Sequence, residues 1–225
     1  MKRVMYAIGL TAMTLMAAPA LAQTTGASAP SANAPSVNLV YAGGFLGVGA
    51  VQNTASIAGG ELGVRVFHNL DVFVEGGYDK DGVPRRRVDL TNTLVPILTK
   101  ASGKTATASI TAPVKFGLGG LRYVFDVTND FHAYVLAEGG KASIEYKPRY
   151  FVNGTDVTDS LATYGITLGS DLVSTEAVPA YGGGFGFWYT KGYVYVDASL
   201  RLLSLQTASQ STNLTRAHIG LGLRF

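Results

Sequence analysis

Histidine is the side chain that enzymes use most often for acid–base catalysis. This chain contains three histidines and no cysteine. His68 and His132 lie in or beside short connections between segments of alternating apolar and polar residues. His218 shares its face of a predicted strand with Arg216 and has no serine two positions away. We therefore predict that His218 is a hydrogen-bonded residue of the interior and that the chain has no catalytic site.

Other site chemistries find equally little support. Without cysteine there are no disulfides and no thiolate metal sites, and no group of histidines and carboxylates has metal-ligand spacing. The glycine clusters at 117–120 and 182–184 are followed by neither a helix nor a Lys-Ser/Thr pair, so they are not phosphate loops. We predict no metal, no cofactor and no enzymatic activity.

Charged residues do recur in a pattern, at alternate positions of otherwise apolar segments. Such alternation places them on one face of a β-strand, with the apolar residues on the other. The segment 193–202 illustrates it, because Val194, Val196, Leu200 and Leu202 alternate with polar residues. We predict that the charged faces form a polar network made of Glu61, Arg65, Glu75, Arg122, Glu138, Asp197, Arg201, Arg216 and His218.

Eight segments of this kind position these residues, at about 38–51, 57–67, 70–79, 113–126, 131–147, 177–189, 193–207 and 213–225. The second, fourth and sixth connections are tight turns, whereas the long connections 80–112 and 148–176 are odd-numbered. Short turns at one rim and long loops at the other are typical of an up-and-down barrel. The sequence therefore predicts an all-β fold, an eight-stranded antiparallel up-and-down barrel.

The charges decide which face of this barrel meets solvent or lipid. A soluble ligand-binding barrel turns its apolar face inward, whereas a membrane barrel turns it outward and fills its lumen with polar groups. An Arg or Lys facing lipid at mid-depth costs about 2–4 kcal/mol. We therefore expect a transmembrane barrel with a narrow, charged and largely closed lumen.

The segment 113–126 leaves two interpretations open. Phe116 and Leu118 share parity with Arg122, so an inward arginine would bring two apolar side chains inward as well. Either a β-bulge or an apolar patch facing a ligand would explain this pattern.

The N-terminal residues predict export. A basic start, an apolar stretch from Val4 to Ala18 and a small-x-small ending at Ala22 are typical of a signal peptide over 1–22. Residues 23–36 are rich in Ala, Ser and Pro and predict a flexible linker, which leaves 37–225 for the barrel. Cleavage would reduce the net charge from +3 to +1, too little to indicate nucleic acid as a partner.

The sequence resembles the small eight-stranded bacterial outer-membrane barrels of the OmpX and OmpA membrane-domain type, over roughly residues 37–225. The chain end AHIGLGLRF carries the most specific likeness, because the alternating Ile219, Leu221, Leu223 and terminal Phe225 are similar to the sorting signal read by the barrel-assembly machinery. The resemblance implies a location in the bacterial outer membrane, in contact with lipid and lipopolysaccharide. Some members are lipid A enzymes with a Ser/His set near the extracellular end, whereas His68 and His132 lie at the periplasmic end.

The long loops 80–112 and 148–176 are the predicted functional surface. Arg85, Arg86 and Arg87 form a basic cluster suited to lipopolysaccharide phosphates or an anionic polymer of a host surface. A solvated loop without a ligand explains the same charges. We expect a non-enzymatic barrel that presents its loops for surface interaction or envelope integrity; the alternatives are a small-solute channel and a lipid A modifying enzyme.

Overall fold

A computed structural model describes residues 39–169, 172–207 and 211–225 of the chain. The predicted signal peptide 1–22 and linker 23–36 lie outside the described residues. Among the described helices, none has the length and apolar character needed to cross a bilayer.

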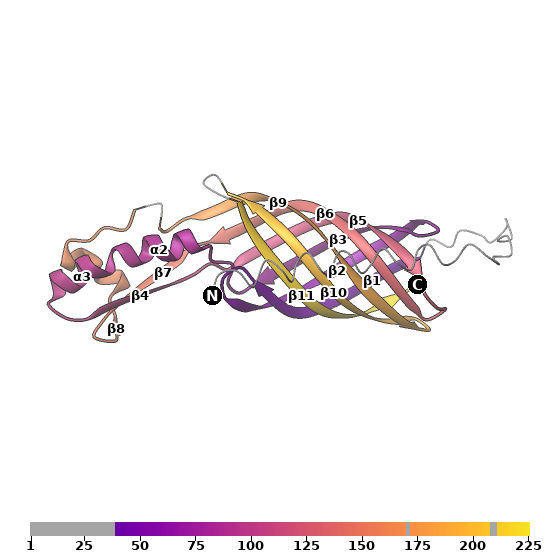
Figure 1. The fold of residues 1–225 in the computed structure, drawn as a ribbon, viewed down its shortest axis with the longest axis horizontal. Helices are drawn as coiled ribbons and strands as arrows, with labels where there is room; N and C mark the ends of the chain where they lie inside the picture. The colour runs from indigo at the N-terminus through magenta and orange to yellow at the C-terminus, as the bar shows by residue number, and fades with distance from the viewer. Residues whose placement is uncertain (1–38, 170–171, 208–210) are drawn as a thin grey trace, which may run out of the picture. The chain divides into compact units, whose positions relative to one another are not determined.

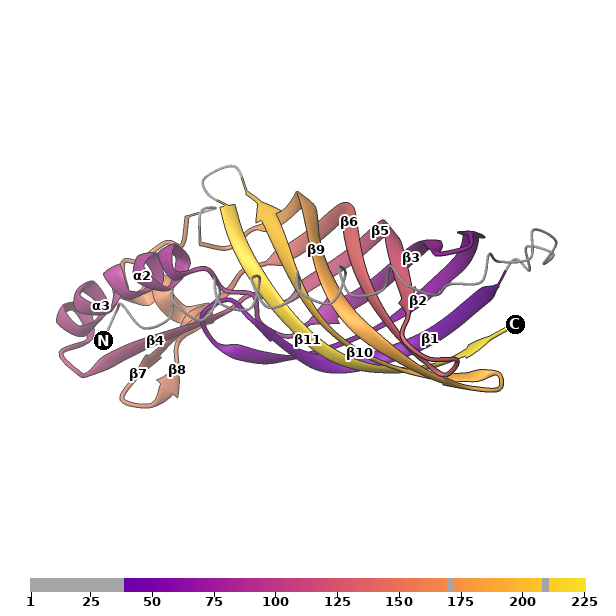
Figure 2. The same cartoon turned by 45° about the vertical axis from the view of Figure 1, so that its right-hand side comes forward.

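Eight antiparallel strands close into a barrel, as Figures 1 and 2 show. Each strand pairs with its neighbours in the barrel, and β1 closes the ring by pairing with β11. The predicted fold class is confirmed. The strands are β1 (Val40–Ala50), β2 (Thr54–Phe67), β3 (Leu70–Asp79), β5 (Val114–Asp126), β6 (Phe131–Glu145), β9 (Thr175–Lys191), β10 (Val194–Gln206) and β11 (Ser211–Arg224).

The connections differ between the two ends of the barrel. Residues 68–69, 127–130 and 192–193 make the turns at one end, which we call the short-turn end. Val40 and Phe225 exchange backbone hydrogen bonds at this end, with N to O distances of 2.8 and 3.1 Å. The two longest connections leave the opposite end, which we call the long-loop end.

The two long connections are not plain loops, because they fold together into a small domain. We call residues 80–112, 146–169 and 172–174 the loop domain. Its three-stranded sheet has the order β4 (Ala106–Thr111), β7 (Lys147–Val152) and β8 (Thr155–Asp156). Helices α2 (Arg85–Thr93) and α3 (Val95–Ser102) and the 3-10 helix η2 (Thr158–Tyr164) complete it. Leu98, Tyr150 and Leu161 lie at the centre of its apolar core.

The barrel is inside out compared with a soluble protein. Large apolar side chains point outward and are exposed, among them Leu46 at 71%, Ile219 at 65% and Leu221 at 62%. The largest fully buried side chains are instead the arginines Arg122, Arg201 and Arg216. Soluble proteins rarely expose large apolar patches and almost never bury arginine without partners. This distribution suits a barrel surrounded by lipid.

The structure also decides between the two interpretations of the segment 113–126. Strand β5 pairs with β3 and with β6 in an unbroken register, which excludes a bulge. Phe116 and Leu118 face the interior, where both are buried in an apolar cluster with Phe45 and Leu203. The shared parity with Arg122 therefore reflects an interior that changes from apolar to charged along the strand.

Candidate functional site: a charged belt inside the barrel

Six charged side chains from different strands meet in the middle of the barrel interior. Five of them are at most 5% exposed and Glu61 is 8% exposed. We call this set the charged belt: Glu61, Glu75, Glu138, Arg122, Arg201 and Arg216. Three carboxylates and three guanidinium groups give it no net formal charge.

Arg201 is the centre of the belt because it contacts all three glutamates. Its Nη2 donates to Glu61 Oε2 at 3.0 Å, and its Nη1 donates to Glu138 Oε2 at 3.2 Å and to Glu75 Oε2. Such charge-assisted hydrogen bonds are stronger than neutral ones and fix the side chains that make them.

The other two arginines pair with different glutamates. Arg122 Nη2 donates to both carboxylate oxygens of Glu61, at 2.7 and 2.8 Å. Arg216 Nη1 donates to Glu75 Oε1 at 2.7 Å, and its Nη2 donates to Glu138. Each glutamate is therefore held by two arginines, which offsets the cost of burying its charge.

An aromatic layer closes the interior on the short-turn side of the belt. The Arg122 guanidinium lies 4.4 Å from the ring centre of Tyr134, 4.5 Å from that of Trp188 and 4.9 Å from that of Phe73. Tyr41 Oη accepts a hydrogen bond from Arg122 Nη1 at 3.1 Å. These cation–π and hydrogen-bond contacts of Arg122 join the belt to the layer.

An apolar layer closes the interior on the long-loop side. Strands β1, β2, β5, β6, β9, β10 and β11 contribute buried side chains such as Phe45, Ile57 and Ile144. Val83 and Ala112, which lie near the two ends of the first long connection, pack in the same cluster. The charged belt is therefore enclosed between two water-excluding layers.

Inward glycines make room for these bulky side chains. A Cβ on Gly63 would lie 2.1 Å from the Tyr41 ring, and a Cβ on Gly186 would lie 2.4 Å from the Tyr134 hydroxyl. Both positions therefore need glycine for a close approach.

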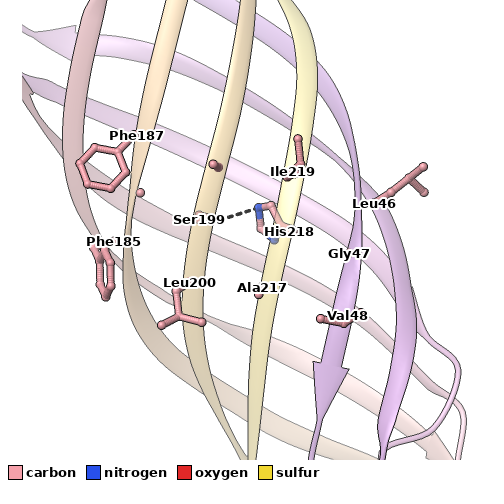
Figure 3. A pocket seen from close by; sticks show the side chains of 12 residues that line it. Leu46, Gly47, Val48, Phe185, Phe187, Ser199, Leu200, Ala217, His218 and Ile219 are labelled. Carbon is pink, nitrogen blue, oxygen red and sulfur yellow. Dashed lines mark hydrogen bonds between the residues drawn. The ribbon is translucent and has the colours of Figure 1, made fainter. Parts of the chain in front are cut away.

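His218 has a serine partner that the sequence did not reveal. Ser199 on β10 is the register partner of His218 on β11, and Ser199 Oγ lies 2.8 Å from His218 Nε2. Figure 3 shows this contact in the barrel wall, beside outward side chains such as Leu46 and Leu200. No serine lies two positions from His218 along its strand, but the register of the 194–206 and 211–224 hairpin places Ser199 directly opposite it.

The Ser199 and His218 pair does not form a catalytic triad. Asp197 Oδ2 lies 3.5 Å from the same Nε2, and Nδ1 of His218 has no hydrogen-bond partner among the described residues. A triad needs its acid on the ring nitrogen opposite the serine. Both side chains are at least nine-tenths buried, and the histidine ring stacks on Phe45 with centroids 4.5 Å apart.

The remaining predicted site residues lie elsewhere. Arg65 is outside the belt and pairs with Asp71 at 2.9 Å. Arg85 and Arg86 are exposed at the start of α2, whereas Arg87 is 12% exposed, donates to Glu176 at 2.5 Å and covers the Tyr146 ring at 4.1 Å. The structure therefore separates Arg87 from the two exposed arginines.

On β11, Ile219, Leu221 and Leu223 point outward next to the seam with β1, and the terminal Phe225 is exposed.

Among the described residues, no three His, Asp or Glu side chains group as metal ligands would. The pKa of the Asp156 carboxyl in the loop domain is shifted by a local cause. The Thr158 hydroxyl and backbone amide donate to Asp156 at 2.6 and 3.0 Å, which lowers the pKa of that carboxyl.

Comparisons with known proteins find likeness in structure. No protein-family model matches the chain, and no curated protein matches it. Neisserial surface protein A is 14% identical, with 83% of this chain and 94% of that one covered and a TM-score of 0.46. The N-terminal β-barrel domain of Pseudomonas aeruginosa OprF is 15% identical, with 84% and 98% covered and a TM-score of 0.47.

The attachment invasion locus protein Ail of Yersinia pestis is also similar. It is 11% identical, with 84% of this chain and 97% of that one covered and a TM-score of 0.44. Another structure of Ail is a complex with the heparin analogue sucrose octasulfate. At these identities the likeness to outer-membrane barrels concerns the fold alone.

Proposed function

We propose that this chain is a non-enzymatic protein of the bacterial outer membrane, a closed barrel that holds the loop domain at the cell surface. The inside-out barrel carries the proposal, because its exposed apolar wall requires lipid and its buried charges require a sealed interior. The short-turn end then faces the periplasm and the long-loop end faces outward.

Aromatic side chains support a membrane interface at the short-turn end. Amphipathic rings gather where the apolar band of a membrane protein meets the headgroups. Seven exposed aromatic residues lie around the short-turn end, namely Phe67, Tyr123, Phe125, Phe131, Tyr189, Tyr193 and Phe225. The outward Ile219, Leu221 and Leu223 belong to the last strand, where the barrel-assembly machinery would read them.

A closed barrel fits the interior better than a channel does. An open pore needs water along its axis, whereas the belt arginines are at most 1% exposed and lie between an apolar and an aromatic layer. Planar-bilayer recording tests this part: we expect little or no steady conductance, and stable large pores would favour the small-solute channel.

The loop domain is the part available to partners in this proposal. Arg85 and Arg86 are exposed in the first turn of α2, which has no acidic residue in that turn. Because the N-terminal end of a helix is itself positive, this turn favours an anionic ligand. The partner we propose is an anionic surface polymer or the phosphates of lipopolysaccharide.

The experiment compares the Arg85→Gln/Arg86→Gln double variant with the matched Lys100→Gln/Lys104→Gln variant, which removes the same charge elsewhere in the loop domain. We expect the wild type to bind immobilised heparin in 0.1 M salt and the arginine variant to elute at lower salt than the lysine variant. Equal elution of the two variants would contradict a specific role for these arginines. Wild-type protein that neither changes gel mobility on heating nor needs detergent for solubility would overturn the membrane assignment.

A further inference from the structure

Two lysines interrupt the apolar outer wall of the barrel. Lys115 on β5 and Lys141 on β6 both point outward and are exposed, in strands whose other outward residues are mostly apolar or glycine. Neither forms an ion pair within the described part of the chain, and the nearby Glu145 pairs with Lys147 at 3.0 Å. Nothing in the barrel itself therefore explains these two charges.

Both lysines stand at the height of the outer headgroups. Ten residues separate Phe125 from Lys115, and ten separate Phe131 from Lys141. At a rise of about 3.3 Å per residue and a tilt of about 40°, ten residues climb roughly 25 Å, which is the height of the apolar band of such barrels. The exposed Tyr78 is the register partner of Lys115 and marks the same interface.

The two lysines can reach one ligand group. Lys115 is opposite Ser143 and Lys141 is opposite Gly117, so the lysines are diagonal neighbours on one face of the β5–β6 pair. Diagonal neighbours lie about 7–8 Å apart, within reach of two long flexible side chains. Their ammonium groups can therefore hold a single phosphate from two sides.

A trough without side chains leads to these lysines across the outer wall. Gly44, Gly60, Gly76 and Gly117 are successive register partners on β1, β2, β3 and β5, and the next partner in the row is Lys141. Gly44 is the fifth residue of its strand from the short-turn end, whereas Lys141 is the eleventh of its own. From Lys141 at the level of the headgroups, the row therefore runs into the apolar band and ends at Gly44. Exposed apolar side chains that include Leu62 and Val74 lie beside it.

Packing inside the chain does not demand three of these four glycines, whereas a Cβ on the fourth, Gly60, would lie 3.3 Å from the Gly43 carbonyl oxygen. A Cβ on Gly44 or Gly76 would lie 3.6 Å or more from the nearest atom, and a Cβ on Gly117 would have nothing within 4 Å. At the inward Gly184, by contrast, a Cβ would lie 2.4 Å from the Leu200 carbonyl oxygen. Outward glycines in a strand weaken it, and they often mark a place where a ligand approaches the backbone.

We propose that the trough and the lysine pair form a binding site for a phosphate-bearing glycolipid of the outer leaflet, with acyl chains along the glycines and a phosphate between Lys115 and Lys141. Charge selects this occupant over a second copy of the chain. A dimer formed through the trough would bury Lys115 and Lys141 of each copy with no acidic residue of the trough to pair with them, which costs energy. The site rests on the proposed function, because it needs the barrel to stand in a membrane.

Native mass spectrometry of the full-length protein in detergent tests the site, with bisphosphorylated lipid A and chemically dephosphorylated lipid A as probes. A lysine near a charged membrane surface contributes about 1 kcal/mol, so each Lys→Gln change should weaken binding of phosphorylated lipid A about fivefold and Lys115→Gln/Lys141→Gln about thirtyfold. Binding of the dephosphorylated lipid should not change. The Lys100→Gln/Lys104→Gln variant, with the same net charge, should behave as wild type.

The trough has its own pair of variants. We expect Gly76→Val/Gly117→Val to weaken both lipids alike, because the new side chains fill the acyl bed, and Ala198→Val on the far wall to weaken neither. The site would be overturned if the wild type bound phosphorylated and dephosphorylated lipid A equally. It would also be overturned if Lys115→Gln/Lys141→Gln and Lys100→Gln/Lys104→Gln lost the same affinity for phosphorylated lipid A. An equal loss of affinity for phosphatidylglycerol in Lys115→Gln/Lys141→Gln would overturn it too. Dimers in place of lipid adducts would overturn it as well. If the same protein still shifts on gels when heated, the membrane barrel stands and only the glycolipid site fails.

Discussion

Removal of Arg201 should destabilise the barrel far more than removal of a surface cation. In Arg201→Met the side chain keeps much of its length but loses the guanidinium that contacts Glu61, Glu75 and Glu138. Glu61 retains Arg122, whereas Glu75 and Glu138 are left to share Arg216. The belt then carries one uncompensated negative charge in a region closed to water.

The size of the effect follows from burial. Breaking a buried ion pair by removing one partner costs about 3–5 kcal/mol. Lys147→Met supplies the control, because its pair with Glu145 is about half exposed on both sides and should contribute at most about 1 kcal/mol. A second change, Glu138→Gln, removes the excess charge and should restore part of the stability lost in Arg201→Met.

Urea unfolding in lipid vesicles measures these differences. The single tryptophan of the sequence, Trp188, is buried in the aromatic layer next to Arg122 and reports on barrel opening. We expect the order wild type, Lys147→Met, Arg201→Met/Glu138→Gln and then Arg201→Met in decreasing stability. If Arg201→Met lost no more than Lys147→Met, or if Glu138→Gln rescued nothing, the belt would not be the sealed network described above.

Three further predictions concern the loop domain and the barrel wall. Leu98→Ala removes a fully buried side chain and should cost the loop domain about 2–5 kcal/mol, seen as faster proteolysis of 80–112 while the heat-dependent gel shift of the barrel persists. Because hydrogen bonds from Thr158 lower the pKa of Asp156, their stabilisation is present above the unfolded pKa and is lost as the pH falls through the folded one. Protection of the Thr158 amide from hydrogen exchange should therefore fall in acid, and Asp156→Asn should abolish that pH dependence. Gly186→Val should lower the free energy of unfolding by about 1–3 kcal/mol, because the new side chain overpacks against the Tyr134 hydroxyl, whereas Gly117→Val should not lower it.

The barrel was predictable because its signal is local. Alternation between apolar and polar residues has the period of a strand, so each strand identifies itself within about ten residues. The lengths of the turns then suggested the up-and-down order. The prediction did not extend to the loop domain, where β4 must pair with β7 across 36 to 46 residues of chain and neither strand exceeds six residues. Short segments of this kind have too little periodicity to be recognised.

The sequence by itself determined which residues share a face and that one face is too charged to meet lipid. It did not determine the partners on that face, because closure of the ring brings together side chains as distant in sequence as Glu61 and Arg201, 140 residues apart. The pairing of Ser199 with His218, the separation of Arg87 from Arg85 and Arg86, and the row of outward glycines that ends at Lys141 likewise depend on strand register and folding of the loops. Register is a property of two strands at once, and only the tertiary structure sets it.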